Sequence, residues 1–438
     1  MVDDESGAAP SSGPADGGLP PVDPPPPADP VAPPLPRRAR RLPTGGTWTG
    51  IVAAGGVLAA FSAPGQTAGL SVFTDPLIAE LGVSRTAVST SYAIGTLIGA
   101  AVLPLTGRAL DRFGVRRMAV VIGVVFAAFL AGLSVATDIV GVTAGFVGVR
   151  MAGQGALSLA ATTLVARSIT ERRGLALGIA SGVGSGGISL APVLVESLIG
   201  AAGIRTAWRL EALAVLVVVV GIALALPRTR RPAVIDRPAE DAPLEWTLPQ
   251  AVRTGMFWVI ASGLATSAMI GTALAFHQIS VLGAQGLTPA EAAVNFLPQT
   301  VTGIAATLLT GALSDRIAPK FGVTISMVTL ATAMLLLPAV APGWTALLYG
   351  LVLGAASGSL RGIEAAAYVR YYGAGNIGVI RGVSTGVGLA STAFGPILLA
   401  LGHDLTGEYV LPVLAGAVLP VAVAVLSVFA RAPRHPGG

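Results

Sequence analysis

The stretch Gly107-Arg-Ala-Leu-Asp-Arg-Phe-Gly-Val-Arg-Arg117 decides how the chain is read, because it places charge and glycine between two long apolar runs. A weaker copy, Gly311-Ala-Leu-Ser-Asp-Arg-Ile-Ala-Pro-Lys320, follows an apolar run that is likewise the second of its half. Both copies hold glycine, three residues, Asp-Arg, and a basic residue four places after that arginine. A charged turn repeated between apolar runs indicates an internally duplicated membrane protein, as many transporters are.

The composition indicates that most of the chain is solvated by a lipid bilayer. Hydrophobic residues make up 53% of the 438 residues and charged residues only 11%, with a mean hydropathy of +0.76, which does not describe soluble domains. The arginines lie at the ends of apolar runs instead of in a stripe, so membrane topology explains the net charge of +5 better than nucleic-acid binding does. The absence of cysteine excludes disulfides and thiolate metal sites.

Twelve apolar runs are long enough to cross about 30 Å of hydrocarbon, which takes about twenty helical residues. Their expected ranges are 51–73, 86–105, 118–136, 142–165, 175–201, 208–226, 256–282, 290–313, 322–340, 345–369, 379–401 and 410–430. The predicted fold is therefore an all-α polytopic membrane protein with twelve transmembrane helices.

The distribution of basic residues predicts the orientation. If the N-terminal tail is cytoplasmic, only Arg85, Arg205 and Arg209 fall on the outer side. The positive-inside bias therefore predicts a multi-pass protein of the cell membrane with both termini in the cytoplasm.

The chain divides into two halves with polar segments around them. Residues 1–47 are rich in proline and carry too little apolar surface to fold, so we expect a disordered cytoplasmic tail. We expect residues 48–227 and 254–431 to form two six-helix halves, joined by the Pro-rich cytoplasmic linker 228–253 and followed by a short tail, 432–438. Helix 8 begins with a capping box from Thr288 to Glu291, and Ser84 offers the matching N-cap for helix 2. An even number of spans in each half relates the halves by an axis along the membrane normal.

The charged turn resembles the loop between helices 2 and 3 of the major facilitator superfamily, whose pattern is Gly-x-x-x-Asp-Arg-x-Gly-x-Arg-Arg. The resemblance covers about residues 48–430 and implies two pseudo-symmetric six-helix bundles that work by alternating access. It also implies a gate, in which Asp111 faces the N-terminal end of a helix in the other half, such as helix 11, when the cavity faces outward. The residues that carry this motif in the two copies are Gly107, Asp111, Arg112, Gly114, Arg116, Arg117, Asp315 and Arg316.

Other stretches resemble the bacterial oxalate/formate antiporter and monocarboxylate transporter group. They are Pro76-Leu-Ile-Ala-Glu-Leu-Gly-Val-Ser-Arg85, Phe276-His277 followed by Gly286-Leu-Thr, and Gly395-Pro396 with Asp404-Leu-Thr-Gly407. Two features depart from the group. Gly203-Ile204-Arg205 stands where Gly-Trp-Arg is expected, and helices 8 and 11 are expected to lack buried basic residues.

Ionisable side chains at membrane depth are the first candidates for the substrate site, because each costs about 2.5 to 3.5 kcal/mol to insert. Arg150 on helix 4 and the pair Arg361 and Glu364 on helix 10 lie on helices that the superfamily exposes to substrate. Arg150 resembles the arginine of the superfamily's helix 4 pattern, although Gln154 follows it one residue later than in that pattern, and its alternative is a structural or proton-coupling role. A guanidinium matches a carboxylate with its planar fork, so Arg361 is a candidate anion site. Glu364 would balance it or exchange a proton. The alternative is that Arg361 and Glu364, three residues apart on one face, only neutralise each other.

Four uncharged or weakly basic side chains complete the candidate substrate site. Gln66 follows Pro64 and Gly65 in the middle of helix 1, where a loosened helix can build a midplane site. His277 could relay a proton or simply be hydrogen-bonded, and Asn295 and Gln299 share a face of helix 8 and could bond between helices instead. The glycines of helix 5 are interpreted as close-packing residues, and are Gly178, Gly182, Gly184, Gly186 and Gly187.

The sequence contains no enzyme motif, and we expect no catalytic residue, metal or cofactor. The leading hypothesis is a monomeric secondary transporter of a small organic anion, a monocarboxylate, in the lipid bilayer, with protons as a candidate coupling ion. One alternative is an exporter of drug-like amphipathic compounds with the same fold. The other is a membrane sensor that transports nothing. Direction, stoichiometry and the role of the tail are left open.

Overall fold

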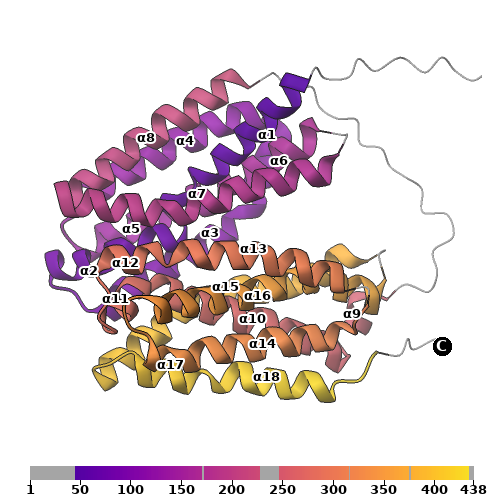
Figure 1. The fold of residues 1–438 in the computed structure, drawn as a ribbon. Coiled ribbons are helices and arrows are strands. Elements are labelled where there is room, and N and C mark those ends of the chain that lie inside the picture. The colour runs from indigo at the N-terminus through magenta and orange to yellow at the C-terminus, as the bar shows by residue number, and fades with distance from the viewer. Residues whose placement is uncertain (1–44, 170–171, 227–245, 315, 374–375, 434–438) are drawn as a thin grey trace, which may run out of the picture. The chain divides into compact units, whose positions relative to one another are not determined.

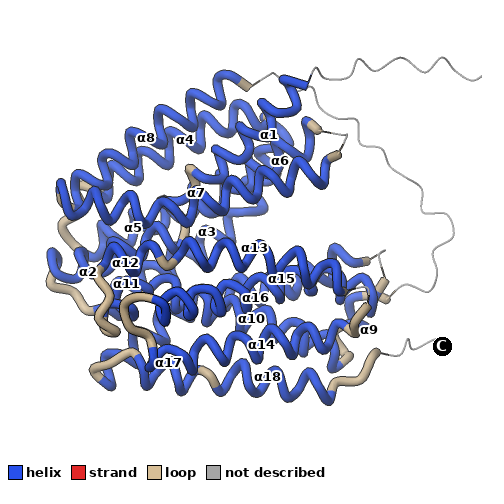
Figure 2. Tube along the Cα trace, in the orientation of Figure 1, coloured by secondary structure: helices blue, strands red, loops and turns tan. Residues whose placement is uncertain are grey.

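The computed structural model describes residues 45–169, 172–226, 246–314, 316–373 and 376–433, without the side chains of residues 45–47 and 365. The N-terminal tail before Gly45, most of the linker, and Asp315 of the second charged turn lie outside these ranges. The described chain is helical and contains no strand (Figure 2). Eleven of its helices are long and apolar enough to cross a bilayer, which confirms the predicted all-α membrane fold.

The first half contributes the indigo to magenta helices of Figure 1, in which α1 packs on α7, α3 on α5, and α4 on α8. The first of these helices begins at Gly45, six residues before the expected start. The elements of the first half are α1 (Gly45–Ala60), η1 (Ala63–Gly65), α2 (Thr67–Leu81), α3 (Arg85–Phe113), α4 (Val115–Leu133), α5 (Ile139–Val149), η2 (Arg150–Leu157), α6 (Ser158–Ser168), α7 (Arg173–Ala202) and α8 (Ile204–Ala225).

The second half contributes the orange to yellow helices, in which α13 packs on α15, α10 on α16, and α14 on both α15 and α18 (Figure 1). The predicted capping box at Thr288 is confirmed, and Ser84 caps α3. The elements of the second half are α9 (Leu248–Ala251), α10 (Gly255–Phe276), α11 (Gln278–Gly283), α12 (Pro289–Val294), α13 (Phe296–Leu313), α14 (Pro319–Leu336), η3 (Leu337–Ala339), α15 (Trp344–Tyr372), α16 (Ile377–Thr406), α17 (Val410–Gly416) and α18 (Val418–Phe429).

The expected helix 4 contains a π-helical turn near its middle. It runs from Ile139 to Ser168 as α5, the π-helical turn η2 and α6. A π-turn absorbs an extra residue because each residue bonds five places back instead of four. This turn covers Arg150 and Gln154, where the Arg-to-Gln spacing is one residue longer than in the superfamily pattern. The longer spacing is therefore accommodated without breaking the helix.

Helix 1 is interrupted where the sequence predicted it. The segment Ala63–Gly65 forms a 3₁₀ turn with Pro64 inside it, and Gln66 has an extended backbone before α2 begins. Proline cannot donate a backbone hydrogen bond, and its ring disfavours a continuous α-helix. The break frees polar backbone groups next to Gln66.

A stripe of glycines brings α13 and α15 into backbone contact. Gly350, Gly354, Gly358 and Gly362 recur every four residues on one face of α15. A Cβ atom on Gly354 would collide with the carbonyl oxygen of Gln299, and one on Gly358 with that of Gly303. This close packing follows the small-residue rule for membrane helices and fixes Arg361, on the same helix, beside α13.

Candidate functional site

A cavity of about 500 Å³ lies between the two halves, and we call it the main cavity because helices of both halves line it. Helices from both halves line it: α2 and α7 from the first, and α10, α13 and α15 from the second. Its polar lining residues are Gln66, Thr67, Ser181, Ser185, Gln299, Thr300, Thr307, Ser357 and Arg361. A substrate in this space would contact both halves, as alternating access requires.

Arg361 is the one charged side chain in this lining of described residues. It is open to the cavity, and its Nη2 lies near Gly303, where a Cβ atom would be only 3.2 Å away. No described residue makes a hydrogen bond or ion pair with it. A guanidinium without a carboxylate partner favours an anion in the cavity.

Glu364 does not pair with Arg361, contrary to the alternative in which the two neutralise each other. Its carboxylate accepts two hydrogen bonds from Arg381 on α16, from Nε at 3.1 Å and from Nη2 at 2.9 Å. Glu364 is 9% exposed and faces α16 instead of the cavity. Arg381 lies in the second turn of α16, the expected helix 11, and its side chain is 39% exposed, so it is not the buried basic residue that this helix was expected to lack.

Two of the predicted amides line the cavity, and both are held by the protein. Gln66 donates through Nε2 to Ser62 and Ser158, at 2.9 and 3.2 Å. Gln299 donates through Nε2 to Gln278 at 2.8 Å and to Asn295 at 3.1 Å. Each amide nitrogen is thereby fixed, and each carbonyl oxygen is left as an acceptor for a ligand.

The other predicted substrate residues lie outside the lining of the main cavity. Arg150 is 2% exposed and is bound by the first half. Its Nε donates to Thr96 at 3.1 Å, its Nη1 donates to the carbonyl of Gly65 at 3.2 Å, and its Cζ lies 4.3 Å from the ring centroid of Tyr92. These contacts connect the π-turn η2 of helix 4 to the break in helix 1 at Gly65 and to helix 2, which is α3. Asn295 is buried and donates to the carbonyl of Ala346 at 2.6 Å.

Residues that the sequence did not single out also line the cavity. Ser181 and Ser185 face it from α7, beside Gly178 and Gly182. The interpretation of all five α7 glycines as packing residues is therefore only partly right: a Cβ atom at Gly178 or Gly182 would meet nothing within 4 Å. Those at Gly184 and Gly187 would collide with Ala59 and Ala60 of α1. The spacing of Ser181 and Ser185 by one helical turn was the available signal.

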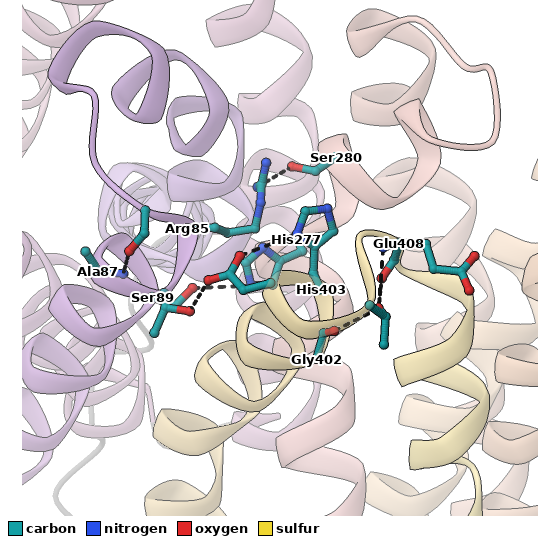
Figure 3. A network of polar contacts seen from close by, with 12 residues as sticks. Arg85, Ala87, Ser89, His277, Ser280, Gly402, His403 and Glu408 are labelled. Atoms are coloured by element: carbon teal, nitrogen blue, oxygen red, sulfur yellow. Dashed lines mark hydrogen bonds and ion pairs between the residues drawn. The ribbon is translucent and has the colours of Figure 1, made fainter.

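A second cluster joins the halves at the face where α3 begins and α16 ends. We call it the opposite face, because α1 begins and α18 ends at the other end of the helices (Figure 1). Arg85 donates to Ser280 of the second half at 2.9 Å (Figure 3). It also forms an ion pair with Asp75 at 2.7 Å. Ser280 in turn donates to Asp75 at 2.7 Å, and Thr86 donates to Asp404 at 2.6 Å.

His277 lies deeper in the same cluster and is fully buried between the halves. Its Nε2 is 3.4 Å from Oγ of Ser89 in the first half (Figure 3). The same Nε2 is 3.0 Å from the carbonyl oxygen of Pro396. Within the described residues, the hydrogen bonds and ion pairs that join the two halves gather at this face, apart from one between Ser189 and Thr300 beside the cavity.

A family comparison accounts for this arrangement. Residues 56–396 match the family model described as Major Facilitator Superfamily. The chain belongs to the major facilitator superfamily. It is therefore a multi-pass membrane transporter built from apolar helices. A comparison with curated proteins gives no match.

Solved structures share this superfamily fold. One is the crystal structure of a bacterial homolog to human lysosomal transporter, Spinster, in an inward-facing and occupied conformation, with a TM-score of 0.67 and 16% identity over 88% of this chain and 97% of that one. The inward-facing and unoccupied conformation gives a TM-score of 0.64 and 16% identity over 88% and 96% of the two chains. At this identity the likeness concerns the fold alone.

The superfamily loop takes a defined shape between α3 and α4. Gly114 ends α3 with a φ of 80°, a backbone conformation that favours glycine. Asp111 forms an ion pair with Arg167 at the end of α6, within the same half. In this conformation Asp111 is therefore bonded within the first half, and its expected contact with helix 11 (α16) in the outward-facing state stays a prediction.

Proposed function

We propose that this superfamily member is a secondary transporter of a small organic monoanion, a monocarboxylate. The observation that carries the proposal is Arg361, an unpaired guanidinium in a cavity whose described lining holds no carboxylate. A cationic substrate would meet an uncompensated like charge there. A carboxylate would meet a planar fork of donors.

The charge of the cavity lining and the presence of the cavity itself separate this proposal from its two alternatives. An exporter of cationic amphipathic compounds would be served by an acidic residue in the cavity, and the described lining has none. A sensor would need no open space of about 500 Å³ between the halves. The stretches that resemble the oxalate/formate antiporter and monocarboxylate transporter group, among them Pro76 to Arg85 and Asp404 to Gly407, agree with a carboxylate.

Within the proposal, the substrate contacts are Arg361, Gln66 and Gln299. Arg150, His277 and Asn295 hold the surrounding helices, and Glu364 with Arg381 is the candidate proton-coupling pair. The polar contacts at the opposite face leave the cavity accessible from the face where α1 begins and α18 ends, which we place toward the cytoplasm of a cell membrane. The likeness to an inward-facing solved structure supports this assignment.

The proposal is tested by uptake of labelled carboxylates into proteoliposomes that contain the full chain, with and without an inward acid gradient. We expect uptake of monocarboxylates that requires the protein. We also expect Glu364→Gln to remove any stimulation by acid, because the amide cannot exchange a proton. The anion assignment fails if no carboxylate moves while a cationic dye is expelled. Acid stimulation that survives Glu364→Gln would remove Glu364 from the coupling mechanism.

A further inference from the structure

The cavity presents hydroxyl groups that the protein itself leaves unused. Ser181 and Ser185 of α7 and Ser357 of α15 line the cavity. All three side chains are partly or fully exposed to it. None of them forms a hydrogen bond with a described residue. This is unusual in a helix, where a serine hydroxyl commonly bonds back to the carbonyl four residues earlier.

Other hydroxyls of the same lining are satisfied internally. Thr307 donates to the carbonyl oxygens of Gly303 and Gly358, at 2.8 and 2.9 Å, and Thr67 is 2.7 Å from the hydroxyl of Tyr92. Thr300 bonds to Ser189. The three free serines therefore differ from their neighbours, and an occluded cavity would leave them without water and without a partner.

The free groups form two pairs on opposite halves. Ser357 and Arg361 are four residues apart on α15, and Ser181 and Ser185 are four residues apart on α7, so each pair lies on one helix face. A ligand whose carboxylate binds Arg361 can place a nearby hydroxyl at Ser357. Reaching Ser181 and Ser185 requires further hydroxyls at the other end of the ligand.

We infer, on the basis of the proposed function, that the preferred substrate is a polyhydroxylated monocarboxylate, that is, a sugar acid. One guanidinium matches one carboxylate, and free hydroxyls on both halves match a chain of hydroxyl groups, which both donate and accept hydrogen bonds. The cavity of about 500 Å³ holds a six-carbon acid with accompanying water. A site built to bond substrate hydroxyls rejects the analogue that lacks them, because its own polar groups are then left unpaired.

The test compares two six-carbon monocarboxylates that differ in hydroxylation, gluconate and hexanoate, as competitors of labelled gluconate uptake into proteoliposomes. We expect gluconate to compete at least about tenfold more strongly than hexanoate, and uncharged gluconamide to compete poorly. Ser181→Ala, Ser185→Ala and Ser357→Ala should each weaken gluconate competition about fivefold and leave hexanoate competition unchanged. Ser181→Thr, which keeps a hydroxyl, should retain the preference.

Ser197→Ala is the matched control on α7, because its hydroxyl already bonds to the carbonyl of Val193 at 2.9 Å. Equal or stronger competition by hexanoate overturns the inference while monocarboxylate transport itself stands. Serine variants that leave gluconate competition unchanged overturn it as well. If neither acid is taken up or competes, the proposed function fails and this inference fails with it.

Discussion

Arg361 concentrates the proposed recognition in one side chain. Its guanidinium can donate two parallel hydrogen bonds to a carboxylate, whereas an ammonium offers a point charge without the fork. We therefore predict that Arg361→Lys weakens substrate affinity by about tenfold or more, since a hydrogen bond to a charged group contributes about 1.5 to 3 kcal/mol. Competition binding to the purified carrier measures this change.

The same substitution at Arg253 is the control for that experiment, because Arg253 is exposed and outside the cavity. Its replacement by lysine should leave affinity unchanged. Full affinity in Arg361→Lys would mean that the planar fork is not the binding element.

The ion-pair partner of Glu364 could not be predicted from the sequence. Arg361 and Glu364 were recognisable as membrane-depth charges, and their spacing permits an ion pair along one helix. The actual partner of Glu364 is Arg381 on the next helix. Helix rotation decides between the two arginines, and packing across α15 and α16 sets that rotation. A single sequence does not encode this packing in a readable pattern.

At the scale of elements, α3 carries the contacts that close the opposite face. Arg85 at its first turn bonds to both halves, and Ser89 one turn later is buried against His277. We predict that Arg85→Gln loosens this face and raises maleimide labelling of a single Ser89→Cys site up to about fivefold, which corresponds to roughly 1 kcal/mol. The natural chain has no cysteine, so the label reports this position alone.

Thr90→Cys serves as the reference site because Thr90 is exposed in the closed face. Its labelling should be the same with Arg85 or Gln at position 85. Unchanged labelling at Ser89→Cys would show that the ion pair does not hold the halves together.

The helices themselves were the most predictable elements, because run length and the ends of charged turns identify a transmembrane segment. The break in helix 1 was also predictable from Pro64 and Gly65, whose backbone restrictions act locally. The π-turn at Arg150 was not predicted from the sequence. Its only signal was one extra residue before Gln154, and the tertiary contacts of Arg150 with Thr96 and Gly65 accompany it.

At the scale of the whole molecule, the two charged turns make an asymmetric prediction about cycling. Asp111 keeps the complete motif around it, whereas the copy at Asp315 lacks the downstream glycine and the arginine pair. We predict that Asp111→Asn slows transport about fivefold or more, since a carboxylate at a helix N-terminus contributes up to about 2 kcal/mol. Asp315→Asn should have a smaller effect. Initial uptake rates at matched protein density measure both, and equal slowing would remove mechanical meaning from the asymmetry.

The cavity was the least predictable feature of the whole molecule. Duplication and composition indicate two halves, yet which side chains line the space between them depends on how those halves pack. Sequence reasoning named Arg361, Gln66 and Gln299 because polar groups in apolar helices are conspicuous. It missed Ser181, Ser185 and Ser357, since serine is common in membrane helices and ordinarily bonds to its own backbone.

The ion pair of Arg85 and Asp75 lies where water reaches it, with side chains 15% and 39% exposed. Such pairs contribute about 0 to 1 kcal/mol, and dissolved ions screen them over about 8 Å at physiological ionic strength. This ion pair therefore contributes more to holding the face closed in dilute medium and less in concentrated salt, whereas the contact between His277 and Ser89 is buried away from dissolved ions. The ionic strength of the compartment that bathes this face thus sets how much the pair adds to the closed state of the carrier.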